Sequence, residues 1–200
     1  MPVPAGDGGR LTELLLALAG RFEECGLYLL APWLPNLPQT DSMVENRMDI
    51  ADFVPIRNYL FDDGKSASPA APLDRIEAAL AADFVPKYAK KLLLGIPSFG
   101  IDYTQAAAGY RKRAVPAEQI CRTLAAPPDV HFDETTQTPF AVYTEDAYHC
   151  PVGHKLCYED ARSLAAKLAV VEKNGLCGIS ICSLAYDTPV LWQLLNQTYK

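Results

Sequence analysis

The sequence predicts an α/β fold, and a helix–strand unit near the C-terminus is the clearest observation behind this prediction. Leu164, Leu168 and Val171 recur at helical spacing, and Gly175 is a residue that commonly ends a helix. The run over residues 176–184 is short and almost continuously apolar, as in strands that are buried on both faces. A helix followed directly by a buried strand is the unit from which α/β layers are built.

The stretches before this unit show the same alternation of helical and extended patterns. The N-terminal residues 1–9 are rich in Gly and Pro and are expected to be disordered. In order, we then expect a helix over 10–24, strands over 27–33 and 50–59, a helix over 72–85 and a strand over 92–97. Prolines at 32, 35 and 38 predict a loop after the first strand, because proline lacks the backbone donor.

The first predicted helix has one alternative interpretation. Residues 14–20 are apolar, and residues 17–19 are similar to the small-residue cleavage site of a secretory signal peptide. Glu13 interrupts the apolar run, however, and Arg10 is the only basic residue before it. The apolar positions continue at helical spacing as far as Phe22, so an amphipathic helix is favoured.

Residues 101–157 break the alternation and predict a separate α+β segment. They contain a basic cluster at 111–113 and a predicted helix over 116–124. Two short alternating runs, 130–133 and 140–143, predict a β-hairpin. The predicted organisation is therefore a disordered N-terminus over 1–9, α/β units over 10–100, the α+β segment over 101–157, and a last helix–strand–helix over 158–200 with its final helix at about 189–199.

Composition excludes several classes of function. The chain has 18 basic and 24 acidic residues, so its formal charge is −6, which argues against a nucleic-acid-binding protein. No apolar run reaches the ~20 residues that a membrane span needs. His131, His149 and His154 lack metal-ligand spacing, and no phosphate-binding loop, dinucleotide motif or Ser-His-Asp pattern is present. We therefore predict no metal and no cofactor.

The cysteine count points to an oxidising compartment. Six cysteines are an even number, which favours disulfides and a secreted protein. Cys150 and Cys157 flank a turn-like loop over residues 151–154 and are the predicted disulfide. Cys177 and Cys182 lie on one predicted strand with opposite orientations, so they are expected to be small buried side chains instead.

Four segments together resemble one enzyme family. The motif Y-E-D-x-x-S-L-x-x-K over residues 158–167, followed by residues 175–187, resembles the last helix–strand unit of family 18 glycoside hydrolases, the chitinases and chitinase-like lectins. Residues 48–59 are similar to the sixth strand of that family's TIM barrel, 91–100 to the seventh, and 27–35 to the fifth. A complete barrel usually takes about 250 residues. The resemblance, which covers about residues 10–190, therefore implies a partial (β/α)8 barrel of strands 5–8, with a small α+β insertion between strands 7 and 8.

The same resemblance implies where a ligand binds and why hydrolysis is not expected. The family's catalytic acid lies in a D-x-x-D-x-D-x-E motif, and the sequence contains no such motif. Residues 57–60 (Arg57, Asn58, Tyr59 and Leu60) align with a family M-x-Y-D motif whose Tyr steadies the substrate's N-acetyl oxygen, so Arg57 replaces the Met and Leu60 the Asp. Cys182 aligns with a Trp that lies under the sugar ring. The full set of expected ligand-binding residues is Tyr59, Arg57, Asn58, Trp33, Tyr103 and Cys182.

Three hypotheses for function remain open. The first is a chitinase-like, non-catalytic protein or fragment that binds chitin or another N-acetylglucosamine-containing glycan. The second is an incomplete chain of an active chitinase, whose acidic motif lies in a missing N-terminal half. The third is a half-barrel that associates with a second half-barrel through exposed sheet edges, since unpaired strand edges are natural association sites.

Overall fold

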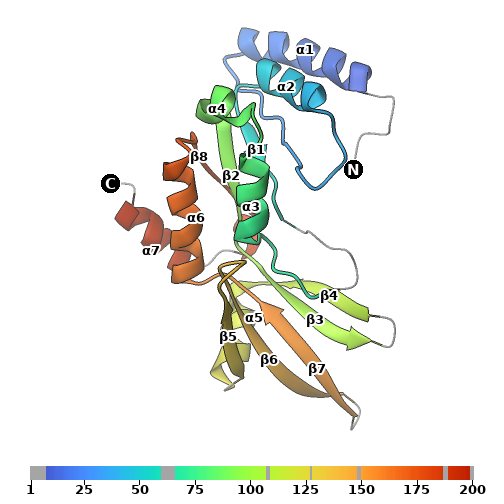
Figure 1. The fold of residues 1–200 in the computed structure, drawn as a ribbon, viewed down its shortest axis with the longest axis vertical. Coiled ribbons are helices and arrows are strands. Elements are labelled where there is room, and N and C mark those ends of the chain that lie inside the picture. Colours follow the sequence, from blue (N-terminus) through green and yellow to red (C-terminus); the bar gives the residue numbers. More distant parts are fainter. Residues whose placement is uncertain are drawn as a thin grey trace. The chain divides into compact units, whose positions relative to one another are not determined.

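The computed structural model describes residues 8–59, 66–106, 109–126, 128–147, 150–186 and 189–198, and has an α/β fold with two sheets (Figure 1). The first sheet has three strands in the order β1-β2-β8, and the second has five in the order β4-β3-β7-β6-β5. The chain divides into two compact units. The first comprises Met1–Arg57, Ala79–Gly95 and Val171–Ser180, and the second comprises Asn58–Ala78, Ile96–Val170 and Ile181–Lys200.

The three-stranded sheet and its helices confirm the predicted α/β fold. Strands β1 (Val54–Ile56) and β2 (Leu92–Pro97) are parallel, with Val54 opposite Leu92. Strand β2 lies where the apolar run predicted it, and β8 (Gly178–Cys182) follows within the predicted run 176–184. Val54, Ile56, Leu92 and Leu94 are fully buried on one face, and the consecutive buried residues 94–97 show that the end of β2 is covered on both faces.

The predicted helices appear in the expected order, and one of them is split into two. Helix α1 (Gly8–Glu24) and the terminal helix α7 (Pro189–Thr198) are confirmed. The helix predicted over 72–85 is two helices, α3 (Leu73–Leu80) and α4 (Val85–Tyr88). Helix α3 ends at Leu80, and α4 begins at Val85 with Pro86 in its first turn, a position where a helix does not need the missing N–H. No helix of the described residues is both long enough and apolar enough to cross a membrane.

Two predicted strands differ from the structure. Residues 27–33 are extended but form only isolated parallel bridges, Leu30 to Phe53 and Trp33 to Ile56. The strand expected over 50–59 is limited to β1, and its first residue instead ends helix α2 (Asp41–Ile50). This helix was not predicted since it has no marked apolar face. Thr40 caps its first turn by accepting a hydrogen bond from the Met43 backbone N–H at 3.4 Å.

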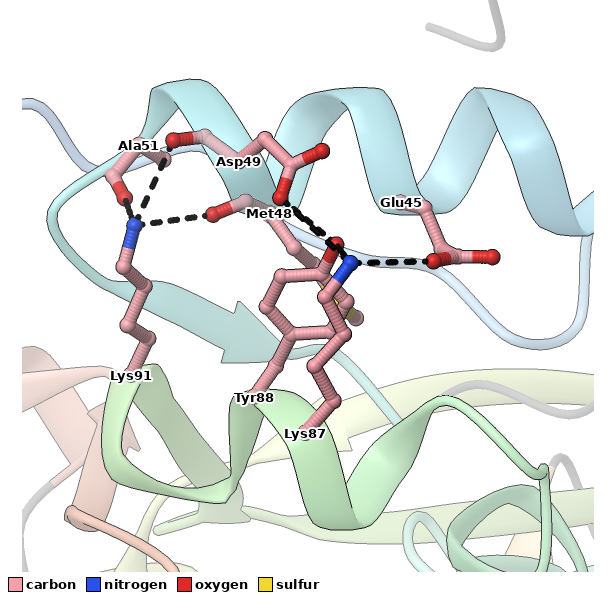
Figure 2. A network of polar contacts seen from close by, with 7 residues as sticks. All are labelled: Glu45, Met48, Asp49, Ala51, Lys87, Tyr88 and Lys91. Atoms are coloured by element: carbon pink, nitrogen blue, oxygen red, sulfur yellow. Dashed lines mark hydrogen bonds and ion pairs between the residues drawn. The ribbon is translucent and has the colours of Figure 1, made fainter.

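The C-terminal end of α2 is closed by Lys91, as Figure 2 shows. The Lys91 ammonium donates to the carbonyl oxygens of Ala51 at 2.9 Å, Met48 at 3.0 Å and Asp49 at 3.4 Å. The last carbonyls of a helix have no partner within the helix and carry the negative end of its dipole. A lysine from a different segment therefore satisfies groups that α2 cannot satisfy itself.

A second set of contacts joins α2 to α4 (Figure 2). The Tyr88 hydroxyl donates to the Asp49 carboxylate at 2.6 Å and accepts from the Lys87 ammonium at 2.6 Å. Lys87 also reaches the Glu45 carboxylate at 3.4 Å. Burial and the Asp49 carboxylate both raise the pKa of Tyr88 above its ordinary value. The phenol is therefore a stable donor in this network.

The second unit contains an antiparallel sheet formed by β3 (Gly100–Ala106), β4 (Gly109–Val115), β5 (Asp129–Asp133), β6 (Thr138–Ala147) and β7 (Cys150–Cys157). The predicted hairpin is confirmed, with His131 opposite Phe140 in β5 and β6. The predicted helix is confirmed as α5 (Ala117–Ala125), which packs Ile120 on the sheet. Strands β3, β4 and β7 were not predicted, because their polar and charged residues hide the alternation.

The motif that begins at Tyr158 fixes the start of helix α6 (Ala161–Lys173). The Asp160 carboxylate accepts from the Ser163 backbone N–H at 2.8 Å, and the Ser163 hydroxyl accepts from the Asp160 N–H at 2.9 Å. One turn further on, the fully buried Lys167 ammonium pairs with the Glu159 carboxylate at 2.7 Å. Burial raises the pKa of Glu159 even beside this cation. Gly175, with a φ of 59°, ends the helix segment as predicted.

The structure contradicts the predicted disulfide between Cys150 and Cys157. Both residues belong to β7, one at each end, and both thiols are free. Seven residue steps along a strand span roughly 23 Å at ~3.3 Å per residue, far beyond the reach of a disulfide. The expected loop over 151–154 is part of this strand. All six cysteines are free, and Cys177, which was expected to be a buried strand residue, is exposed and precedes β8.

The helix cap provides a stability test. Replacing Lys91 with Met should lower the free energy of unfolding by about 1–2 kcal/mol, because three carbonyl groups lose a charged donor. Urea unfolding followed by circular dichroism measures this difference. Lys90→Met is the matched control: Lys90 is exposed, and its loss should change stability by less than about 0.5 kcal/mol. Equal effects of the two variants would contradict the proposed cap.

Candidate functional site

The second unit brings three of the predicted ligand residues together in one cluster. Tyr59 and Tyr103 are buried in it, and Cys182 packs against it. The other buried members are Ala70, Phe99, Ile101 and Cys157, and the partly buried Ala67, Phe140 and Tyr186 pack around them. We call this set the aromatic cluster. It gathers residues that lie more than 120 positions apart in the sequence, from Tyr59 to Tyr186.

Ser98 fixes the position of Cys182 in the aromatic cluster. The Ser98 backbone N–H donates to the Cys182 carbonyl at 2.9 Å, and its hydroxyl donates to the Ser183 carbonyl at 2.6 Å. Ser98 follows directly after β2, and Cys182 is the last residue of β8. The two strand ends are therefore held at a defined spacing, next to the edge-on ring pair of Phe99 and Tyr186, whose centroids lie 6.1 Å apart.

The Tyr103 hydroxyl is hydrogen-bonded within the protein, so the ring is the part of this side chain that packs in the aromatic cluster. The Tyr103 hydroxyl donates to the Ser68 carbonyl at 2.8 Å, and its ring meets the Tyr110 ring edge-on at 6.1 Å. Tyr110 is more exposed than Tyr103 and is the outer ring of this pair. Tyr110, at 42% exposed, is the ring of this pair that offers apolar surface of the kind that packs against the faces of sugar rings, and the buried Tyr103 supports it from beneath.

Asn58 is the most unusual predicted residue. Its side chain is fully buried, and neither amide atom has a hydrogen-bond partner in the described part of the chain. A buried amide without partners costs roughly 1–3 kcal/mol per group and commonly marks a water or ligand position. Arg57, one residue earlier, is exposed, while its backbone N–H donates to the Trp33 carbonyl at 2.8 Å.

Trp33 lies in the core of the first unit. It is buried and packs edge-on against Phe84, with the ring centroids 5.3 Å apart. A ring packed in this way has little surface left for a sugar, so burial argues against a role for Trp33 in binding. Its assignment as a ligand residue rested on its position before a proline-rich loop, which does not determine burial.

The opposite face of the five-stranded sheet carries a polar network that the sequence did not predict. Asp102 is buried, and its carboxylate accepts from the Tyr143 hydroxyl at 3.1 Å and from the Arg113 guanidinium at 3.3 Å. Nδ1 of His154 lies 3.1 Å from both carboxylate oxygens. Burial first, and then the charge of Asp102, raises the pKa of Tyr143 above its ordinary value. The phenol therefore remains a protonated donor.

Cys157, on the same face as the aromatic cluster, is not a reactive nucleophile. Burial raises the pKa of its thiol to about 11, more than the nearby Lys155 lowers it. Among the described residues there is no group of three or more side chains placed to hold a metal ion. His149 and the aligned Leu60 lie outside those residues.

Sequence reasoning missed Ser98, Phe99 and Tyr186 as parts of this site. Ser98 and Phe99 follow directly after a correctly predicted strand, and in parallel sheets the residues after such strands line the functional edge. Their position after the strand could therefore have identified them as site residues from the sequence. Asp102, Tyr143 and His154 gave no such signal, because their contacts depend on the pairing of β3, β6 and β7.

The Tyr103 hydroxyl can be tested without removing the ring. Tyr103→Phe should lower the free energy of unfolding by about 1 kcal/mol, since the hydrogen bond to Ser68 is lost in a buried position. Tyr110→Phe, in the more exposed partner ring, should change it by less than about 0.5 kcal/mol. Urea unfolding of both variants measures the difference, and a larger loss in Tyr110→Phe would contradict this assignment.

Comparisons with known proteins agree with this geometry. The chain is 33% identical over 159 residues to the cortical fragment-lytic enzyme of Bacillus subtilis, a match that covers 76% of the chain and 35% of that relative. The fold is similar to that of the spore cortex-lytic enzyme SleL of Bacillus megaterium, with a TM-score of 0.80, 22% identity, and 97% of this chain and 46% of that chain covered. It is also similar to a chitinase of Cycas revoluta in complex with (GlcNAc)3, with a TM-score of 0.75, 20% identity, and 100% of this chain and 66% of that chain covered.

The chain thus spans about a third of the length of the Bacillus subtilis relative and just under half of the SleL chain. The structural likenesses are below 25% identity and bear on the fold alone. The match to a family model is more extensive, because the model named Glycosyl hydrolases family 18 covers residues 4–187 of the 200. The chain therefore belongs to glycosyl hydrolases family 18.

Proposed function

We propose that this chain is the C-terminal half of a family 18 barrel, and that it binds an N-acetylglucosamine-containing glycan without hydrolysing it. In this proposal, residues 27–33 and strands β1, β2 and β8 correspond to strands five to eight. Strands β3 to β7 and α5 form the insertion between strands seven and eight. The parallel bridges from Leu30 and Trp33, the parallel β1–β2 register and the sheet order β1-β2-β8 support this assignment.

The observation that carries the binding proposal is the aromatic cluster. Tyr59 and Phe99 follow β1 and β2, and Cys182 ends β8, so the cluster lies at the strand ends where barrel enzymes bind their substrates. The exposed ring of Tyr110, which packs on Tyr103, supplies an accessible aromatic surface next to it. The ligand class follows from the family and from the Cycas revoluta relative, whose structure contains (GlcNAc)3. The Bacillus relatives, named for lysis of spore cortex, are consistent with a glycan ligand.

The absence of hydrolysis follows from the chemistry that the chain lacks. Glycoside hydrolysis needs a carboxylic acid that protonates the leaving oxygen. The 200 residues contain no D-x-x-D-x-D-x-E motif. In addition, the thiol of Cys182 offers no ring for stacking at the position that resembles the family's Trp. We expect binding to be weak for this reason.

One experiment tests both parts of the proposal. The purified chain is titrated with (GlcNAc)3 by calorimetry, and longer chito-oligosaccharides are followed for hydrolysis beside the Cycas revoluta chitinase as a positive control. We expect measurable binding and no turnover. Cys182→Trp should tighten binding by roughly three- to tenfold, since an aromatic contact contributes about 0.5–1.5 kcal/mol.

The thermal melting of Cys182→Trp shows whether the larger ring is accommodated. Cys177→Trp is the matched control, because Cys177 is an exposed cysteine outside the aromatic cluster. Turnover of chito-oligosaccharide by the unaltered chain would refute the non-catalytic proposal. No binding by either the unaltered chain or a folded Cys182→Trp variant would refute the binding proposal.

A second candidate function is association with another half-barrel, and the extended segment before Trp33 favours it. The Leu29 N–H donates to the Asp52 carboxylate at 2.7 Å. The Ala31 and Trp33 N–H groups donate to the carbonyl oxygens of Phe53 and Pro55, at 3.2 and 2.9 Å. Alternate residues of a strand point their backbone groups to opposite edges, so those of Tyr28 and Leu30 face the other way. The side chains of Tyr28 and Leu30 are 70% and 51% exposed.

This edge predicts concentration-dependent association. Sedimentation velocity should show a species heavier than the monomer at high concentration, and Leu30→Lys should shift it towards the monomer, because a charge on an exposed edge opposes pairing. Val190→Lys is the control, since Val190 is an exposed apolar residue on α7. A monomer at all concentrations would count against this function.

A further inference from the structure

We propose that the chain has a second saccharide-binding site, in a groove between α5 and β6 that is separate from the aromatic cluster. The groove has a volume of about 810 Å3 and lies within the range of small-molecule sites. Its lining includes Gln119 and Thr123 from α5 and Tyr143 and Glu145 from β6. All these residues belong to the second unit.

Strand alternation separates this groove from the aromatic cluster. Asp102 and Tyr103 are neighbours on β3, so their side chains project from opposite faces of the sheet. Tyr103 belongs to the aromatic cluster, whereas Asp102 binds the Tyr143 hydroxyl beneath the groove. Glu145 lies two positions after Tyr143 and projects from the same face. A ligand in the groove therefore does not contact Tyr59 or Tyr103.

The aromatic wall of the groove is held in place before any ligand arrives. The Tyr143 ring is stacked on His154, with centroids 4.8 Å apart and planes inclined by 21°. Both side chains are tied to the buried Asp102 carboxylate, the phenol by its hydroxyl and the imidazole by Nδ1. Preorganised aromatic side chains lower the entropy cost of binding, because no rotamer has to be fixed by the ligand.

The charges around the groove disfavour an anionic ligand. The Arg122 guanidinium is paired with Glu118, and the Asp129 carboxylate lies 2.9 Å from Nε2 of His131. The Glu145 carboxylate lies 3.9 Å from His154 Nε2 and its side chain is 60% exposed, so it can accept hydrogen bonds from a ligand. The groove offers an amide from Gln119, a hydroxyl from Thr123 and a carboxylate from Glu145, all beside the Tyr143 ring. These groups match a molecule with several hydroxyl groups and an apolar face. A saccharide has this chemistry.

The test maps binding residue by residue. The 15N-labelled full chain is titrated with (GlcNAc)3, and backbone amide shifts are recorded by NMR. We expect saturable shifts at residues of α5 and β6 that line the groove, such as Gln119 and Tyr143. Shifts at Tyr59 and Tyr103 report the aromatic cluster instead, so this proposal and the proposed function succeed or fail independently.

Variants then identify the groups that bind. Tyr143→Leu should weaken binding at the groove by roughly three- to tenfold, whereas Tyr143→Phe keeps the ring and should stay within about twofold. Glu145→Gln should also weaken it, by about threefold or more, because a charged acceptor becomes a neutral one. The matched control is Glu172→Gln, an exposed glutamate on α6 that does not line the groove.

The outcomes separate cleanly. Glu145 is largely exposed, so Glu145→Gln retains the fold even if Tyr143→Leu does not, and a dispersed NMR spectrum verifies each variant. Shifts confined to the aromatic cluster, or no shifts at all, would overturn the second site. Unchanged groove affinity in folded Glu145→Gln and Tyr143→Leu would overturn it as well.

Discussion

The structure depends on strand β2 as the shared strand of the parallel sheet. It pairs with β1 through Val54 opposite Leu92, and it lies next to β8 in the sheet order. Its backbone leads directly into Ser98, whose two hydrogen bonds hold the end of β8 at Cys182 and Ser183. Because backbone groups buried in a sheet must all be paired, this strand cannot shift without unpairing its neighbours. The positions of Phe99 and Cys182 in the aromatic cluster follow from that constraint.

The five-stranded sheet has two faces with different chemistry. One face contributes Tyr103 and Cys157 to the aromatic cluster, and the other carries Asp102 with the side chains that bind it. A buried carboxylate is tolerated here because Arg113, Tyr143 and His154 surround it with donors. The same strands thus support an apolar site on one face and a polar network on the other.

Patterns of short range predicted much of the fold. The apolar run 92–97, the spacing of Leu164 and Leu168, and the hairpin around His131 and Phe140 all appear where expected. Sequence patterns failed where an element has no clear apolar periodicity, or where a residue far along the chain completes it. Helix α2 has no apolar stripe and is closed by Lys91, 40 positions after Ala51. The predicted disulfide between Cys150 and Cys157 is wrong because residues 151–154 continue strand β7 instead of forming a loop.

The sequence by itself determined the α/β alternation, because apolar spacing is local, and the family, because four short motifs carry its pattern. The choice of Tyr59, Tyr103 and Cys182 as ligand-binding residues follows from that resemblance and stays a prediction. Only the tertiary structure decided which of the six predicted residues meet. It placed Trp33 in a core against Phe84, and left the Asn58 amide buried without a partner in the described residues. Burial and hydrogen bonding depend on which distant segments pack together, and spacing along the chain does not encode that information.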